Sequence, residues 1–134
     1  SLKLLKEINK EGEKNNRVID CLLQVHIAKE ETKYGLNEEE LNLIISQFDD
    51  LKMTNARICG LMGMASFTED MNLIRNEFKK LKEIFNHHAK LRTPNSEHQT
   101  LSMGMSSDYT IAIEEGSNMV RIGSLLFGER YGKQ

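Results

Sequence analysis

Four short apolar runs alternate with longer amphipathic segments along the chain. The runs are rich in branched side chains and are bounded by polar or small residues, which is typical of strands buried in a parallel sheet. The pattern therefore predicts four strands, at about Val18–Ala28, Arg57–Met64, Thr100–Gly104 and Met119–Ile122.

The two long segments between these runs have the spacing of amphipathic helices. Asn37 and Glu40 resemble a capping box before the first helix, and Ser66 and Glu69 have the same spacing before the second. Apolar residues then recur every three or four positions, which gives each predicted helix a buried face. They are Leu41, Ile44, Ile45 and Phe48 in the first helix, and Met71, Ile74, Phe78, Leu81 and Phe85 in the second, which we expect Pro94 and Asn95 to end.

Three shorter helices complete the pattern. The first is expected near Leu2–Glu11 and ends at Gly12, since glycine favours helix termination. Another is expected at Ile111–Glu115, closed by Gly116, and a last helical turn begins at Ser124. Helices and strands are thus predicted to alternate from one end of the chain to the other.

This order predicts an α/β fold with four parallel strands. The connections between strands are too long for hairpins, and parallel strands are joined by crossovers, which here are helical. Four such units make half of a (β/α)8 barrel, the whole of which takes about 250 residues. If they are the last four units, the third and fourth strands precede the loops at which barrels commonly bind phosphate. We therefore expect residues 1–134 to form a single domain, the C-terminal half of a TIM barrel.

Half a barrel leaves its inner sheet face and both edge strands open to water, which parallel sheets rarely tolerate. Three arrangements would solve this problem. The missing half is supplied by another chain or segment, two copies of this chain pair, or the strands rearrange into an open sheet with helices on both faces. The sequence does not distinguish among them.

Composition narrows the class of protein. The 134 residues are 39% hydrophobic and 28% charged, with a net charge of −2. The apolar runs are shorter than the roughly 18 residues that would indicate a membrane span. Basic and acidic residues are interspersed, so we expect no basic face for nucleic acid. The first residues are Lys-rich and amphipathic and do not resemble a signal peptide, which favours the cytoplasm.

The cysteines and histidines do not indicate a metal site. Cys21 and Cys59 lie in separate apolar runs without Cys-x-x-Cys spacing, so buried free thiols are expected in place of a metal or redox pair. His87 and His88 are adjacent on a predicted helix and therefore point in different directions, and no recognised ligand spacing links them to His98.

Two joints between a predicted strand and the following helix are candidate anion sites. The first contains Met105, Ser106, Ser107 and Asp108, and the second contains Gly123 and Ser124. The first N–H groups of a helix have no partner inside it, and glycine lets an anion approach the backbone closely. From the residues alone, plain helix capping is the favoured interpretation of the first joint, and Ser106, Ser107 and Asp108 would perform it equally well.

Three longer patterns add a resemblance to these observations. They are KEETKYGL (Lys29–Leu36), RICGLMGMA (Arg57–Ala65) and LSMGMSSDYTIAIEEGSNMVRIGSLLFGER (Leu101–Arg130). In order and spacing they resemble the pyridoxal phosphate homeostasis proteins, a family similar to the barrel domain of alanine racemase. The resemblance covers essentially the whole chain, whereas the family's first half, which carries the Schiff-base lysine, has no counterpart in it.

The resemblance implies a site for pyridoxal 5′-phosphate at the two joints. Arg121 matches an arginine that faces the pyridine nitrogen and keeps it unprotonated; the alternative is a salt bridge with a strand carboxylate. Gly123 and Ser124 match positions whose backbone N–H groups hold the phosphate. Ser106, next to Met105, matches a serine ligand of the same group.

Four further residues have weaker implied roles. Met62 matches a strand end that lines the pocket of the ring, although methionine there is more often core packing. Lys33 matches a lysine near the mouth of the site, although exposed loop lysines usually have no function. Gln24 and His26 share one face of a predicted strand by alternation, which predicts a satisfied polar pair inside the barrel.

Two functions of different classes follow from the resemblance. In the first, the protein carries or buffers pyridoxal phosphate for vitamin B6 homeostasis without turnover. This chain then supplies the phosphate and pyridine-nitrogen side of the site but not the Schiff-base lysine. In the second, the chain is a fragment of a racemase-like enzyme, which usually takes a second base from another domain. We favour the carrier because the chain ends at Gln134, soon after the phosphate motif. A role only as one half of an assembly is a third alternative.

Overall fold

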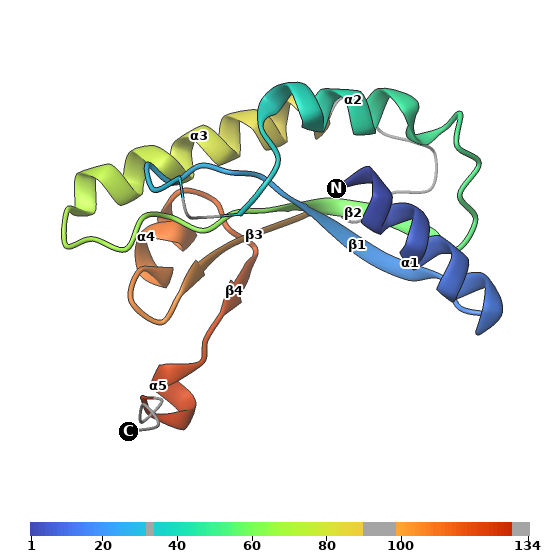
Figure 1. Cartoon of the computed structure of the whole chain (residues 1–134). Helices are drawn as coiled ribbons and strands as arrows, with labels where there is room; N and C mark the ends of the chain where they lie inside the picture. Colours follow the sequence, from blue (N-terminus) through green and yellow to red (C-terminus); the bar gives the residue numbers. More distant parts are fainter. Residues whose placement is uncertain (32–33, 90–98, 130–134) are drawn as a thin grey trace.

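Helices and strands alternate throughout the part of the chain that the computed structural model describes, which comprises residues 1–31, 34–89 and 99–129 (Figure 1). Their order is that predicted from the sequence. The helices are α1 (Leu2–Lys14), α2 (Glu38–Phe48), α3 (Met71–Ala89), α4 (Tyr109–Glu114) and α5 (Ser124–Phe127). The strands are β1 (Ile19–Gln24), β2 (Ala56–Met62), β3 (Thr100–Met105) and β4 (Met119–Arg121).

The four strands form one sheet in the order β1-β2-β3-β4, and every neighbouring pair is parallel. The predicted α/β class with four parallel strands is therefore confirmed. In the register, Gln24 lies opposite Met62, Met62 lies opposite Ser102, and Met105 lies opposite Arg121. Because the strands are parallel, the residues at their carboxyl ends gather along one edge of the sheet.

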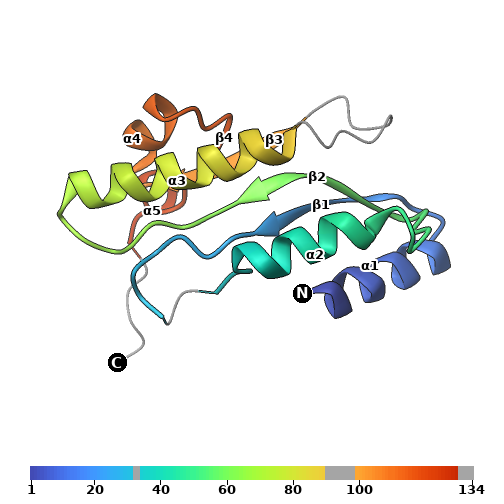
Figure 2. The ribbon, with the colours of Figure 1, turned by 90° about the horizontal axis from the view of Figure 1, so that it is seen from above.

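The hydrophobic core lies between one face of the sheet and helices α1 to α4 (Figure 2). Alternate strand residues such as Leu23, Leu61 and Leu101 are buried in the same cluster as residues of all four helices. The arrangement with helices on both faces of an open sheet, one of the three left open by the sequence, is therefore not the one adopted. The helical members are Leu5, Leu41, Ile44, Ile74, Phe78, Leu81, Ile84 and Ala112.

The first strand is shorter than the predicted Val18–Ala28. β1 ends at Gln24, and Val25 forms an isolated bridge with Leu36. The backbone of His26 then donates to the carbonyl of Leu36 at 2.9 Å, so the chain pairs with the end of its own loop instead of extending the sheet. The other strands begin or end within two residues of their predicted bounds.

Helix α1 continues to Lys14, so the prediction that Gly12 ends it is wrong. Gly12 is buried inside the helix, where it lets the backbone pass close to two loops. A Cβ atom at this position would lie 2.9 Å from the carbonyl oxygens of Arg17 and Asn55. The glycine is therefore needed for close packing and not for termination.

The two predicted capping boxes had different outcomes. Asn37 and Glu40 form one at the start of α2, with both reciprocal hydrogen bonds present. The Ser66 and Glu69 box is wrong, because α3 begins only at Met71. The carboxylate of Asp70 caps this helix by accepting hydrogen bonds from the backbone nitrogens of Asn72 and Leu73, at 3.0 and 3.1 Å.

The predicted apolar faces of α2 and α3 are largely confirmed. Leu41 and Ile44 are buried in α2, and Phe78 and Leu81 are fully buried in α3. Met71 is the exception, because it is the first residue of α3 and 53% exposed. Pro94 and Asn95, which were expected to end this helix, lie outside the described residues.

The short helix near Ile111–Glu115 also forms, shifted by one or two residues to Tyr109–Glu114. Gly116 follows it with a φ of 95°, a conformation that glycine adopts readily, as expected for the residue that closes the helix. The last helical turn begins at Ser124 as predicted.

Candidate functional site

The two predicted anion joints meet at the side chain of Ser106. Its hydroxyl oxygen accepts hydrogen bonds from the backbone nitrogen of Gly123 at 3.2 Å and from that of Leu125 at 3.4 Å. Ser106 follows β3, whereas the two donors belong to the joint between β4 and α5. One hydroxyl therefore lies among the first N–H groups of the neighbouring joint.

The turn after β3 is arranged so that Ser106 does not cap its own helix. Asp108 takes over the closure of this turn, because its carboxylate accepts a hydrogen bond from the backbone nitrogen of Met105 at 2.7 Å. The backbone nitrogen of Asp108 donates to the carbonyl of Met105 at 3.2 Å. Ser106 thus points across to the next joint, which is a different role from the local capping considered from the sequence.

A glycine brings α4 close to β3 just before this turn. Gly104 has a φ of 99°, and a Cβ at this position would lie 2.6 Å from the Cβ of Ala112. A larger residue would push the helix away from the strand and move the turn that carries Ser106. The sequence Met-Gly-Met at 103–105 is therefore part of how the joint is positioned.

Side chains of the α4–β4 loop hold β4 beside β3. The hydroxyl of Ser117 donates to the carbonyl of Met103 at 2.7 Å. The side chain of Asn118 both accepts and donates. Its oxygen accepts a hydrogen bond from the backbone nitrogen of Leu101 at 2.8 Å, and its NH2 group donates to the carbonyl of Gln99. These bonds supplement an irregular strand pairing and place the β4–α5 joint next to the β3–α4 turn.

Arg121, at the end of β4, lies across the carboxyl ends of two neighbouring strands. Its guanidinium donates to the hydroxyl of Ser102 at 2.6 Å and to the carbonyl of Gly63 at 3.3 Å. Among the described residues no carboxylate forms a salt bridge with it, so the alternative considered from the sequence is not what forms. Burial lowers the pKa of the guanidinium, which the charge of Asp108 partly offsets. The group still stays protonated, because arginine does not lose its proton in proteins.

The space in front of Gly123 is open. A Cβ placed on this residue would have no heavy atom within 4 Å. Ser124 and Met105 beside it are also exposed. The joint therefore has free space beside Gly123, next to the backbone N–H groups of Gly123 and Leu125 that donate to the oxygen of Ser106.

The remaining predicted residues are Met62, Lys33, Gln24 and His26. Met62 is half-buried at the end of β2, in register with Ser102. Lys33 lies outside the described residues. Gln24 and His26 do not pair with each other: their side chains bond to the backbone carbonyls of Tyr34 and Glu30, at 3.0 and 2.9 Å. Both are thus satisfied by the loop that follows β1.

Ser102 and Gly63, the partners of Arg121, were not among the residues predicted from the sequence. Ser102 is 1% exposed and in contact with the guanidinium, and alternation along β3 puts it on the opposite face from buried Leu101 and Met103. A serine between two apolar residues of a predicted strand is visible in the sequence, so Ser102 could have been predicted. The carbonyl of Gly63 left no such signal, because it is a backbone group placed by the loop after β2.

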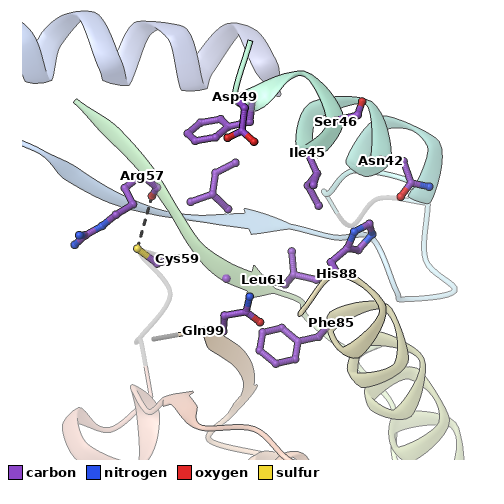
Figure 3. Close-up of a pocket in the computed structure, with 13 residues that line it drawn as sticks. Asn42, Ile45, Ser46, Asp49, Arg57, Cys59, Leu61, Phe85, His88 and Gln99 are labelled. Atoms are coloured by element: carbon purple, nitrogen blue, oxygen red, sulfur yellow. Dashed lines mark hydrogen bonds between the residues drawn. The ribbon is translucent and has the colours of Figure 1, made fainter. Parts of the chain in front are cut away.

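A separate cavity of about 470 Å³ lies between α2 and α3 over β2 (Figure 3). Figure 3 shows Ile45 of α2 and Phe85 of α3 on opposite sides of Leu61 of β2. None of the predicted cofactor residues in the described part of the chain lines this cavity.

Cys59, which lines this cavity, and Cys21 are free and half-buried, and burial raises the pKa of both thiols. Within the described residues no cluster of three potential metal ligands is found, and no helix there is long and apolar enough to cross a membrane. His98 lies outside that part of the chain.

Comparison with known proteins gives one family and several relatives. The sequence profile of the family described as "Alanine racemase, N-terminal domain" matches residues 1–131. A pyridoxal phosphate homeostasis protein from Aquifex aeolicus is 42% identical over 127 residues, which cover 95% of this chain and 54% of the relative. One from Haemophilus influenzae is 35% identical, over 96% of this chain and 53% of the relative. The chain thus spans about half the length of these curated relatives.

Solved structures agree with these matches. PipY of Synechococcus elongatus with PLP bound is 25% identical, with a TM-score of 0.78 over 96% of this chain and 57% of PipY. An unknown protein from Bifidobacterium adolescentis is 27% identical, with a TM-score of 0.83 over 95% of this chain and 50% of that protein. An alanine racemase from Clostridium difficile, at 17% identity and a TM-score of 0.63, shares the fold.

Proposed function

Because the chain belongs to the family of the alanine racemase N-terminal domain, we propose that it supplies one side of a pyridoxal 5′-phosphate site in a vitamin B6 homeostasis protein. In this proposal the chain holds the phosphate and faces the ring nitrogen, and the protein binds, buffers and delivers the cofactor without turning over a substrate. The remaining wall of the site comes from the missing half of the barrel or from a second copy of this chain.

The observation that carries the proposal is the convergence of Ser106 with the N–H groups of Gly123 and Leu125. Phosphate oxygens accept hydrogen bonds from backbone N–H groups at the start of a helical turn and from hydroxyl groups. Here both kinds of donor lie within about one hydrogen-bond length of each other, beside open space in front of Gly123. In this proposal a phosphate oxygen replaces the Ser106 oxygen as the acceptor of these two N–H groups, and the Ser106 hydroxyl donates to the phosphate.

The expected affinity for the phosphate group is sufficient for a cofactor carrier. Hydrogen bonds to a charged group contribute about 1.5–3 kcal/mol each. Three or four of them supply much of the roughly 8 kcal/mol that a micromolar dissociation constant represents, before ordering costs. The phosphate alone can then anchor the cofactor while its aldehyde end stays available for transfer.

Arg121 fits the role of a partner for the ring nitrogen. When bound, pyridoxal phosphate supplies an electron sink for carbanion chemistry, and that sink is strongest when the ring nitrogen carries a proton. A guanidinium is donor-only and permanently charged, so it offers a hydrogen bond to an unprotonated nitrogen and disfavours a proton there. Its bonds to Ser102 and Gly63 hold it in one position.

The homeostasis function is favoured over a racemase-like activity by the relatives. The curated relatives at 35–42% identity are named pyridoxal phosphate homeostasis proteins, whereas the alanine racemase match at 17% shows the fold alone.

Two assays on the natural full-length protein test the proposal. Titration should give saturable, stoichiometric binding of pyridoxal 5′-phosphate, and binding of pyridoxal, which lacks the phosphate, should be weaker by at least about a hundredfold. Equal affinity for the two compounds would contradict the phosphate assignment. The loaded protein should not racemise amino acids at ordinary enzymatic rates of about 1–10³ per second; such turnover would favour the racemase-like function.

A further inference from the structure

A buried carboxylate lies behind the loops that follow β1 and β2. Glu77 of α3 is 5% exposed, and acidic side chains are rarely buried so deeply unless they are paired. It accepts three hydrogen bonds, from the hydroxyl of Ser66 at 2.7 Å, from the backbone nitrogen of Ser66 at 2.7 Å, and from the backbone nitrogen of Lys29 at 3.1 Å. Both carboxylate oxygens are therefore engaged by loop residues.

These contacts join three distant parts of the chain. Lys29 belongs to the loop after β1, Ser66 to the loop after β2, and Glu77 to the helix outside them. The backbone nitrogen of Lys29 is also 3.0 Å from the hydroxyl of Ser66, so the loops touch each other at the carboxylate. Hydrogen bonds to a charged acceptor are about twice as strong as neutral ones. The backbone nitrogen of Phe67 also donates to the carboxylate of Glu30 at 3.0 Å, so a carboxylate holds the two loops together at two places.

The loop after β2 continues directly into the proposed cofactor site. Gly63, three residues before Ser66, donates its backbone N–H to the carbonyl of Ser102 at 3.1 Å and accepts from the guanidinium of Arg121. Arg121 in turn donates to the hydroxyl of Ser102. A displacement of the loop therefore moves one of the acceptors that hold the arginine in place.

We propose that Glu77 is a positioning residue for cofactor retention: it fixes the two loops at the mouth of the site and so slows release of pyridoxal phosphate. The inference rests on the proposed function. It differs from a purely structural role in one respect, because it predicts a change in the rate of cofactor release and not only in the stability of the fold.

Glu77→Gln tests the inference with the smallest change of shape. A glutamine has one carbonyl oxygen and one NH2 group. In either orientation its NH2 group therefore faces a backbone N–H, that of Lys29 or that of Ser66, and that hydrogen bond is lost. Ser66→Ala is the milder second variant, since it removes only the hydroxyl and leaves both backbone donors. Glu83→Gln, an exposed position on the same helix, is the matched control.

Two readouts are taken on the natural full-length protein. Amide hydrogen exchange of the cofactor-free protein should be faster in Glu77→Gln over 26–31 and 63–69 and unchanged over 78–88. The release rate, measured as transfer of pyridoxal 5′-phosphate to an excess of an apo-aminotransferase, should rise about tenfold, as expected for one lost hydrogen bond to a charged group. Ser66→Ala should show a smaller rise and Glu83→Gln none.

The outcomes separate the inference from the function on which it rests. Unchanged exchange in both loops, or faster exchange with an unchanged release rate, would overturn the role of Glu77 while the cofactor site stands. If the wild-type protein does not bind pyridoxal 5′-phosphate, the proposed function fails and so does the role in retention, and the exchange data then decide whether Glu77 fixes the loops at all.

Discussion

The side-chain oxygen of Ser106 lies 3.2 Å from the backbone nitrogen of Gly123, although the two residues are 17 positions apart and follow different strands. The contact brings together two strand-to-helix joints that are separate in the sequence. In a parallel sheet with β3 beside β4, this is the edge at which both joints must lie. The proposed phosphate site is therefore a product of the sheet order.

Gly123→Val should weaken cofactor binding without destabilising the fold. A Cβ at this position meets no protein atom within 4 Å, so the valine side chain occupies the space that the phosphate requires. We expect the dissociation constant for pyridoxal 5′-phosphate to rise at least about tenfold, while the unfolding midpoint changes little. Ser46→Ala, at an exposed position of α2 away from the joints, is the control and should bind normally. A tenfold loss in both variants would mean that the effect is not specific to Gly123.

Arg121→Leu should also lower cofactor retention, by a different route. The substitution removes the donors that reach Ser102 and Gly63 and the charge that faces the ring nitrogen in the proposal. The hydroxyl of Ser102 and the carbonyl of Gly63 then lose this donor, which costs about 1–3 kcal/mol for each buried group left unpaired, so the unfolding midpoint of the variant is measured beside its cofactor retention. We expect at least about a tenfold faster loss of cofactor on dialysis, followed by its absorbance.

The control for this substitution is Arg57→Leu. Arg57 is exposed and forms an ion pair with Asp20 at 2.7 Å, at the opposite ends of the strands. The Arg57→Leu variant should retain the cofactor as well as the wild type does. If Arg121→Leu retains the cofactor as well as Arg57→Leu does, Arg121 is not part of the site.

Phe78→Ala should be strongly destabilising. Phe78 is 0% exposed at the centre of α3, and truncating a buried phenylalanine leaves a cavity and costs about 3–5 kcal/mol. Phe67→Ala is the natural comparison, because Phe67 is 86% exposed and should change stability by less than about 0.5 kcal/mol. Chemical denaturation of both variants checks the difference, and equal midpoints would mean that α3 does not pack as described.

Much of the fold could be predicted from the sequence because its signals are local. The spacing of Leu41 and Ile44 and the Asn37–Glu40 box specify α2 by themselves, and the box is present. The prediction failed where tertiary contacts decided the outcome. Gly12 is buried in α1 because two loop carbonyls approach it, and Ser66 bonds to Glu77 in place of capping α3.

The candidate site was predictable only in part for the same reason. The two joints have short sequence signals, and the sheet brings them together. The partners of Arg121 depend on register, since Ser102 and Gly63 belong to other strands and loops. A carbonyl has no residue-specific signal, so the position of Gly63 required the structure.

Acid should destabilise the protein through His88. Burial lowers the pKa of its imidazole, with a smaller contribution from His87, and its Nδ1 is buried without a hydrogen-bond partner among the described residues. The unfolded chain has the ordinary value of about 6.5 and therefore binds the proton first. Stability falls as the pH decreases from above about 6.5 through the lower pKa of the folded state.

His88→Gln tests this dependence. The variant should lose less stability than the wild type between about pH 7.5 and pH 5, measured by chemical denaturation at each pH. His87→Gln should have a smaller effect in the same direction, because it removes only the neighbouring charge. Identical pH profiles for His88→Gln and the wild type would show that His88 is not the group responsible.

The proposed phosphate site is tested most directly by a map of the backbone amides that respond to the cofactor. The natural full-length protein, labelled with 15N, is titrated with pyridoxal 5′-phosphate, and amide shifts are followed by NMR. The largest changes among the residues described here are expected at Ser106, Gly123, Ser124 and Leu125, where the two joints meet. Saturation with these amides unmoved, or with the largest changes around the cavity between α2 and α3, would show that the phosphate does not bind where the two joints meet.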